Sequence, residues 1–220
     1  MALIGGAVLL ATRDQGGSFL AGVIPGIGES RPPTPEFRFD IAKVKANTTT
    51  ETRSKKVLPA AKDAAEGVRT SLDVVYFDGF VDPDHWDGGD YDDVWDVFDD
   101  GAREQAKNDV QALTLGDDAG DVYDFVQPDK GVVAVNVLTG PNDEPSQVLA
   151  KAFFSATAEH DDGSYTKITS SGTFFLRQVD GEWRIYFYDV DRTEKQTEAP
   201  TPSTSGSPSN SGATPTETSP

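Results

Sequence analysis

The hydrophobic and polar positions of this chain repeat with two periods, helical in the first half and strand-like in the second. Residues 55–80 carry apolar side chains at alternating spacings of four and three, which places them on one face of a helix. That face consists of Ala61, Ala65, Val68, Leu72 and Val75. Pro59 suits the first turn of this helix, where a missing N–H costs nothing. Residues 102–115 repeat the helical pattern, and Gly116 is a typical C-terminal stop.

Alternating positions predict strands at both ends of the domain. Phe37, Phe39 and Ile41 alternate with more polar neighbours before a polar break at residues 47–52. From residue 121 onward the period is two throughout. It predicts strands at residues 122–127, 133–137, 148–160 and 165–178, with turns at residues 128–131, 140–145 and 161–164. The strand at 148–160 carries small side chains on one face, which leaves room for a closely packed helix or a cavity. That face is Val148, Ala150, Ala152, Phe154, Ala156 and Ala158.

The last two strands form a predicted hairpin across residues 172–191. Asp180 and Gly181 tolerate the positive φ values that a two-residue hairpin turn requires. Strict alternation puts Trp183, Ile185 and Phe187 on one face of the second strand, and it puts Tyr186, Tyr188 and Val190 on the other. Both faces are apolar, so we expect both to be covered. The upstream helix covers one, and a pocket, a partner subunit or a second layer covers the other.

The acidic residues 78–100 invite a calcium hypothesis, which the spacing does not support. An EF-hand loop beginning at Asp82 would have Trp86 at position 5 and Asp87 at position 6, where an acid and a glycine are needed. We therefore predict no metal site. Asp90 instead suits the cap of a helix, and Tyr91, Val94, Trp95 and Phe98 form its apolar face. Asp96, Asp99 and Asp100 are expected in solvent.

Composition excludes several classes of partner. The 220 residues carry a net charge of −18 and form no cluster of lysine and arginine, which argues against binding to nucleic acid or to anionic lipid. There is no cysteine, which excludes thiolate catalysis, disulfides and zinc–cysteine sites. No pattern indicates a cofactor.

The two ends of the chain differ from its centre. Residues 1–12 are apolar and uncharged but shorter than the roughly 20 residues of a membrane span. We interpret residues 1–13 as the end of a membrane anchor; a disordered apolar N-terminus is the alternative. Residues 14–36 are a Gly/Pro-rich spacer. Residues 194–220 lack large apolar side chains and are expected to be a disordered Pro/Ser/Thr-rich tail, either wall-spanning, O-glycosylated or plainly unstructured.

Helices followed by an antiparallel meander predict an α+β domain over residues 37–193. The hairpin residues are Gly172, Phe174, Leu176, Arg177, Asp180, Gly181, Trp183, Arg184, Ile185, Tyr188 and Val190. This pattern resembles the NTF2-like (SnoaL-type, cystatin-like) superfamily. The stretch ALTLG at residues 112–116 and the loop from Asp82 to Trp86 are similar to membrane-anchored actinobacterial members.

The resemblance implies an NTF2-like cone, with N-terminal helices packed on a curved antiparallel sheet that holds a ligand inside or dimerises through its convex face. Enzymes of the superfamily use a carboxylate or histidine base inside the cone, with Tyr or Asp oxyanion donors. His85 and His160, the two histidines, do not lie on an apolar inward face of the predicted elements. For the interior candidates Tyr123, Tyr165, Asp189 and Trp95 we expect structural roles.

We therefore expect a non-catalytic, extracytoplasmic domain with a binding or scaffold role in the cell envelope, held by a single-pass membrane anchor. The alternative is a small-molecule-binding enzyme of the isomerase or cyclase kind. Expected partners are a protein, a small apolar ligand, or a second copy paired through the sheet. Trp86, Tyr91 and Trp95 are the candidate binding residues, and ordinary packing over the cone mouth is the alternative role for them. An inward acid or histidine would favour an enzyme, and an empty apolar cone a ligand-binding protein. A filled cone with an apolar convex face would favour a scaffold.

Overall fold

The structure is a computed structural model that describes residues 33–48 and 51–198. Five strands form one sheet in the order β1-β2-β3-β4-β5. They are β1 (Asp40–Asn47), β2 (Tyr123–Thr139), β3 (Pro145–His160), β4 (Tyr165–Val179) and β5 (Glu182–Thr197). Strands β2 to β5 pair antiparallel, and β1 pairs parallel with β2. The α+β prediction is confirmed at this level: a long helix packs on a five-stranded, mostly antiparallel sheet.

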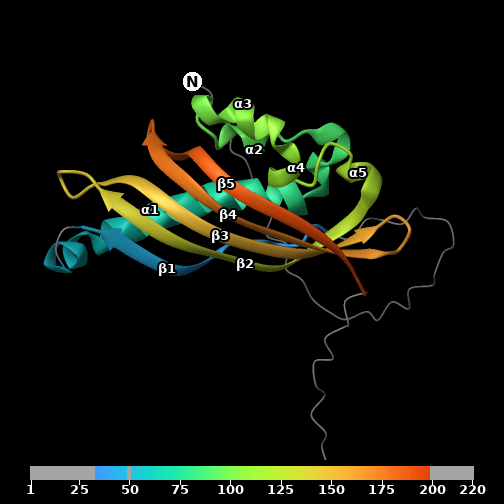
Figure 1. The fold of residues 1–220 in the computed structure, drawn as a ribbon, viewed down its shortest axis with the longest axis horizontal. Helices are drawn as coiled ribbons and strands as arrows, with labels where there is room; N and C mark the ends of the chain where they lie inside the picture. Colours follow the sequence, from blue (N-terminus) through green and yellow to red (C-terminus); the bar gives the residue numbers. More distant parts are fainter. Residues whose placement is uncertain (1–32, 49–50, 199–220) are drawn as a thin grey trace, which may run out of the picture. The chain divides into compact units, whose positions relative to one another are not determined.

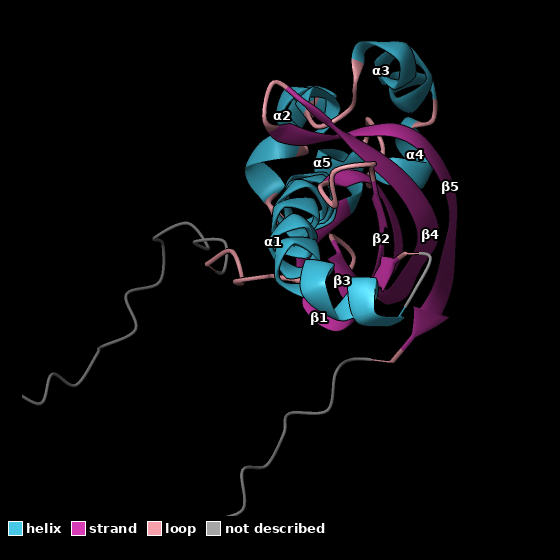
Figure 2. Ribbon diagram, turned by 90° about the vertical axis from the view of Figure 1, so that its left-hand side faces the viewer, coloured by secondary structure: helices cyan, strands magenta, loops and turns pink. Residues whose placement is uncertain are grey.

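The helices occupy the chain between β1 and β2. The long helix α1 (Glu51–Tyr76) continues directly into a π-helical turn, η1 (Phe77–Val81). Short helices follow: η2 (Pro83–His85), η3 (Asp87–Gly89), α2 (Asp92–Asp96), α3 (Asp100–Asn108), α4 (Val110–Leu113) and α5 (Ala119–Val122). The sheet curves around α1, α2 to α4 lie on the side of β5, and α5 leads directly into β2 (Figures 1 and 2).

The predicted apolar stripe of α1 is confirmed, because all five of its side chains are at most 1% exposed. The helix begins at Glu51, where an ion pair to Lys55 one turn later supports the first turn. Pro59 therefore lies inside the helix. The prediction that it lies in the first turn is wrong. Gly67 allows Trp183, near the tip of the β4–β5 hairpin, to pack closely against α1, because a Cβ at position 67 would lie 2.5 Å from Cδ1 of Trp183.

The predicted turn at residues 128–131 is wrong, because β2 runs through it as one strand. The ladder to β3 shifts register between Pro128 and Lys130, so the chain makes a bulge in place of a turn. A proline has no N–H to give to a ladder, and a bulge is where a strand tolerates it. The inward face predicted for residues 148–160 is confirmed, with every side chain at most 5% exposed.

The β4–β5 hairpin turns at the predicted residues, with φ of 53° at Asp180 and 88° at Gly181. Its faces differ from the prediction. Leu176 pairs with Ile185 and Phe175 pairs with Phe187, so Tyr186 is an extra residue in β5. This bulge reverses the alternation: Phe187 is 53% exposed, whereas Tyr188 is buried on the same side as Trp183 and Ile185.

Backbone pairing covers the outer edge of β5 near its start. Ile185 donates its N–H to Val97 O and accepts the N–H of Asp99, both at 2.9 Å. The segment after α2 thus acts as a short extra strand at an edge that would otherwise be open.

None of the described helices is long and apolar enough to cross a membrane. The predicted anchor at residues 1–13 and most of the spacer lie outside the described residues, as do residues 199–220 of the predicted tail. Strand β5 itself extends to Thr197.

Candidate functional site

The interior between α1 and the sheet is filled by aromatic side chains. Tyr76 lies at its centre, with four ring centroids 5.0–6.3 Å from its own. Those rings belong to Phe39, Phe80, Phe154 and Phe174, each at most 1% exposed. Rings at these distances are in packing contact and leave little room between them.

The polar groups of this interior are hydrogen-bonded to one another. The Tyr76 hydroxyl lies 3.0 Å from Ser170 Oγ, and burial raises the pKa of Tyr76 to about 12, so the phenol stays protonated. Ser71 Oγ donates to the carbonyl of Trp183 at 2.7 Å, which ties α1 to β5. Among the described residues, Asp99 is the one buried carboxylate, and it caps a helix. No inward acid or histidine suited to proton transfer is therefore found among the described core residues.

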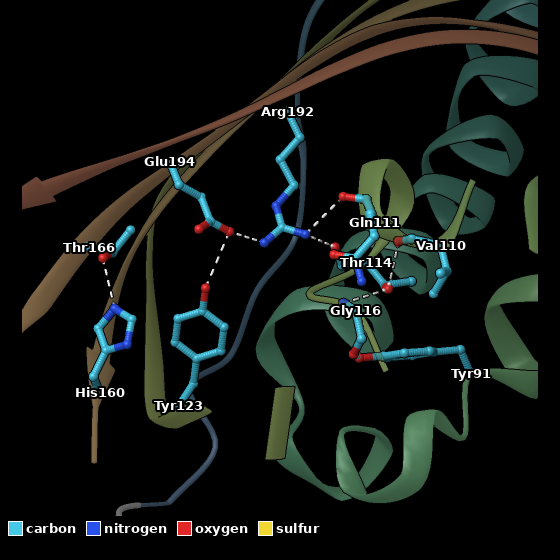
Figure 3. A network of polar contacts seen from close by, with 10 residues as sticks. All are labelled: Tyr91, Val110, Gln111, Thr114, Gly116, Tyr123, His160, Thr166, Arg192 and Glu194. Carbon is cyan, nitrogen blue, oxygen red and sulfur yellow. Dashed lines mark hydrogen bonds and ion pairs between the residues drawn. The ribbon is translucent and has the colours of Figure 1, made fainter. Parts of the chain in front are cut away.

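A second polar network joins the far end of β5 to the helices (Figure 3). Arg192 donates to the carbonyls of Gln111, at 2.9 Å, and Thr114 near the end of α4, and it pairs with Glu194. The Tyr123 hydroxyl donates to Glu194 Oε1 at 3.2 Å. An arginine on the last carbonyls of a helix is a stabilising C-terminal contact, so this network has a structural explanation.

The candidate interior residues do not converge on one point. Burial, helped by the nearby Glu194 carboxylate, raises the pKa of Tyr123 to about 12, which removes it as a base at neutral pH. His160 lies beside the Tyr123 ring, 4.8 Å between centroids, and its Nε2 is 2.7 Å from Thr166 Oγ1. Tyr165 is half-buried and Asp189 is exposed on the outer face of the sheet. These side chains do not form a catalytic constellation.

The three candidate binding residues lie in the core. Trp86, Tyr91 and Trp95 are 0%, 1% and 7% exposed. The rings of Tyr91 and Trp95 make an edge contact at 6.2 Å, and the Tyr91 hydroxyl donates to Gly116 O at 2.8 Å. Their burial agrees with packing of the loop over the core. Ligand binding through them stays a prediction.

Two predictions about the acidic segment are wrong: Asp99 is not in solvent, and Asp90 does not cap a helix. Helix α2 has Tyr91 at its N-cap with no side-chain cap. Asp99 is 7% exposed, not in solvent, and its Oδ1 accepts from Gly101 N and Ala102 N, both at 3.1 Å, at the start of α3. Its Oδ2 lies 2.6 Å from Arg177 Nη2 on β4. An aspartate just before an apolar-periodic run is a recognised start signal that could have located this cap.

The outer face of the sheet carries an apolar row that crosses four strands, β2 to β5. Leu149 pairs with Phe175, and Phe175 pairs with Phe187, so their side chains are direct cross-strand neighbours. The rings of Phe175 and Phe187 are 5.5 Å apart. Beside the row lies a hollow of about 200 Å³ whose apolar lining includes Leu138 and Tyr186. We call Leu149, Phe175 and Phe187, together with Leu138 and Tyr186, the outer apolar row.

A groove follows one side of α1, between residues 34–38 and the β4–β5 hairpin. Two hollows of about 670 and 540 Å³ share Thr70, Val74 and Asp78. The first lies against residues 34–38, and the second reaches the hairpin tip at residues 181–184. Burial raises the pKa of Asp73 and of Asp78 in this groove to about 6.

The chain matches no family model and no curated protein. The α+β architecture therefore stands on the structure alone.

Proposed function

We propose that this chain is a non-catalytic binding domain of the NTF2-like superfamily that acts as a scaffold in the cell envelope through the outer face of its sheet. One observation carries the proposal: the interior is filled by rings around Tyr76, while the apolar side chain of Phe187 points out of the sheet. An enzyme or a carrier of the superfamily type would need the opposite arrangement, with an accessible interior.

The outer apolar row has the properties of a contact surface. Phe187 is 53% and Leu138 is 42% exposed, and soluble proteins that expose adjoining large apolar side chains commonly use them for association. Aromatic side chains supply much of the binding free energy at protein interfaces. The row runs from β2 across β3 and β4 to β5, so it offers one continuous strip.

A second copy of this chain is the partner that we propose for this face. This face carries charges of both signs. Lys151 on β3 and Asp189 on β5 lie beside the row, and both side chains are exposed. A two-fold pairing brings the same surface from each copy together, and a face with both signs can complement itself. A purely acidic face on a chain of charge −18 would repel its copy.

The envelope location is supported by the sequence at the ends of the chain. An apolar run at residues 1–12 followed by a Gly/Pro-rich spacer suits a domain tethered outside a membrane.

Sedimentation velocity of the 220-residue chain tests the proposal. We expect a dimer at micromolar concentration and at least a tenfold weaker dimer for Phe187→Ser, because the exposed ring can be removed without opening the core. Val179→Ser is the matched control, since Val179 is 37% exposed at the hairpin end and is outside the row. A wild-type monomer at 100-fold higher concentration would refute the pairing. A small-molecule adduct on that monomer in native mass spectrometry would favour the ligand-binding enzyme.

A further inference from the structure

We propose that Asp78, His85 and Asp93 form a binding site for one divalent transition-metal ion of the Zn²⁺ class. The site lies beside the end of α1, away from the outer apolar row, and does not depend on the function proposed above. One ligand atom from each of the three residues lies within 4.8 Å of the other two.

Three successive elements bring these residues together. Asp78 belongs to the π-helical turn η1, His85 ends η2, and Asp93 is in the first turn of α2. The π-helical turn is closed by the bond from Asp82 N to Phe77 O, at 2.9 Å, which reaches back five residues. Such turns are rare in proteins and occur frequently at functional sites.

The imidazole of His85 is oriented as a metal ligand would be. Its Nδ1 lies 3.1 Å from the carbonyl oxygen of Asp90. A carbonyl oxygen only accepts, so Nδ1 carries the proton and the lone pair of the neutral ring is on Nε2. Metal-ligating histidines commonly donate their other N–H to a carbonyl or carboxylate in this way. Asp90 is not itself a member of the cluster.

The lone pair on Nε2 faces carboxylate oxygens at separations that suit a shared ion. Nε2 lies 3.8 Å from Asp78 Oδ1 and 3.9 Å from Asp82 Oδ2. These distances are too long for hydrogen bonds. Neighbouring ligands of a tetrahedral zinc ion are about 3.3 Å apart, so Nε2 and Asp78 Oδ1 would approach each other by about half an ångström on binding, and the Asp93 carboxylate would move in as well.

The cluster combines negative charges, and no lysine or arginine of the described residues forms an ion pair with Asp78 or Asp93. Among the ion pairs of the described residues, His85 is the partner of Asp78. The Asp78 carboxylate is 15% exposed and lies close to Asp82 and Asp93. A bound divalent cation would offset both the burial and the mutual repulsion of these carboxylates.

The donor set selects the class of ion. One imidazole nitrogen with carboxylate oxygens is a common ligand set for Zn²⁺. Ca²⁺ prefers six to eight oxygen ligands, and the calcium-loop spacing fails at Trp86 and Asp87. Asp78 lines both hollows of the groove and Asp93 lines one, so a further coordination position would face the groove.

Competition of the full chain against a chromophoric zinc chelator at 150 mM NaCl tests the site. We expect one equivalent of Zn²⁺ to bind, with at least tenfold weaker binding for His85→Ala and Asp93→Asn. Asp92→Asn is the matched control, because it removes the same charge from the same turn of α2, where Asp92 is also exposed. We expect less than a threefold change for this control, and Ca²⁺ at least tenfold weaker than Zn²⁺.

Equal losses for Asp92→Asn and Asp93→Asn would show general attraction of cations to an acidic surface and overturn the proposal. Unchanged affinity of His85→Ala, or binding that never saturates at one equivalent, would overturn it too. Visible absorption of the Co²⁺-loaded chain gives a second readout, because a nitrogen ligand and low coordination number produce intense bands that a hydrated ion lacks. Circular dichroism of each variant separates loss of the site from loss of the fold.

Discussion

Asp99 connects two parts of the domain through two different interactions, and their strengths should differ. Its Oδ1 caps α3, whereas its Oδ2 pairs with Arg177, whose side chain is 53% exposed. Loss of a helix cap costs about 1–2 kcal/mol, and an ion pair with an exposed partner is worth less than about 1 kcal/mol. We therefore expect Asp99→Ala to lower the free energy of unfolding by about 1–2 kcal/mol and Arg177→Ala by much less.

Urea denaturation of the two variants measures this difference. Asp99→Asn is the control, because its amide oxygen still caps the helix while the charge is lost. Equal losses for Asp99→Ala and Arg177→Ala would mean that the ion pair, and not the cap, supports this contact.

Asp73 should make the domain less stable as the pH rises from about 4 to 6. Desolvation raises the pKa of its carboxyl from 3.8 to about 6, although the Phe39 N–H and Arg38 oppose this shift. The folded state then binds more protons than the unfolded state within that window, so stability falls as Asp73 ionises. Asp73→Asn should stabilise the domain by about 1–2 kcal/mol at pH 8, since the amide oxygen can still accept from Phe39.

At pH 3.5 the difference in stability between the variant and the wild type should nearly vanish, because the wild-type carboxyl is then protonated in the folded state and mostly protonated in the unfolded state. Urea midpoints at pH 3.5 and pH 8 give the comparison. A variant that is less stable than wild type at pH 8 would show that the ion pairs of Asp73 with Arg38 and Arg69, at 3.8 and 3.7 Å, outweigh desolvation.

At the scale of elements, the bulge in β5 predicts that two single-residue deletions in this strand have different effects on the fold. Removing Tyr186 restores a regular ladder and leaves Trp183, Ile185 and Tyr188 facing inward. Removing Asp189, in the regular part of the strand, turns every later residue to the opposite face and takes Arg192 away from the α4 carbonyls.

We expect the Tyr186 deletion to unfold cooperatively in a thermal melt and the Asp189 deletion to lose its cooperative transition. Far-UV circular dichroism and intrinsic tryptophan fluorescence report the two transitions. If both deletions melt alike, the two faces of β5 are not distinguished by its register.

The same bulge shows what the sequence does not reveal about this fold. The Asp180–Gly181 turn and the stripe of α1 follow from local chemistry, and both were predicted. The extra residue in β5 and the continuation of β2 through Pro128 depend on how neighbouring strands pair, which local patterns do not encode. The parallel partner of β1 was missed for the same reason.

Much of the candidate site was also hidden in the sequence. The aromatic residues at 86, 91 and 95 were recognised as a cluster, but only the packing shows that they are buried. The approach of His85 to Asp78 depends on the π-helical turn, which has no reliable sequence signal. Strict alternation places Phe187 on the same face as Trp183 and Ile185, whereas the bulge puts it on the opposite, exposed face.

At the scale of the whole molecule, the charge of −18 should control the association that we propose. Two copies repel each other, and salt shortens the screening length from about 10 Å at 0.1 M to about 3 Å at 1 M. The dimer should therefore tighten severalfold between 0.1 and 1 M NaCl. Sedimentation velocity across this range checks it, with Phe187→Ser as the control. A dimer that weakens with salt would indicate interfacial ion pairs in place of an apolar contact.

The parallel pairing of β1 also affects the way in which the chain reaches its native state. Each of β2 to β5 meets its neighbour after a short turn, whereas β1 meets Val132 to Leu138 of β2 only after all the helices have been traversed. Closing so long a loop is entropically costly, and contacts of high sequence separation form slowly. Until β1 docks, the β2 edge presents unpaired N–H and C=O groups in a valine-rich stretch, a template for intermolecular strand addition. Among the described strands β1 is made first, and we expect it to be the last to cover the sheet edge, so that aggregation competes with folding for as long as this step takes.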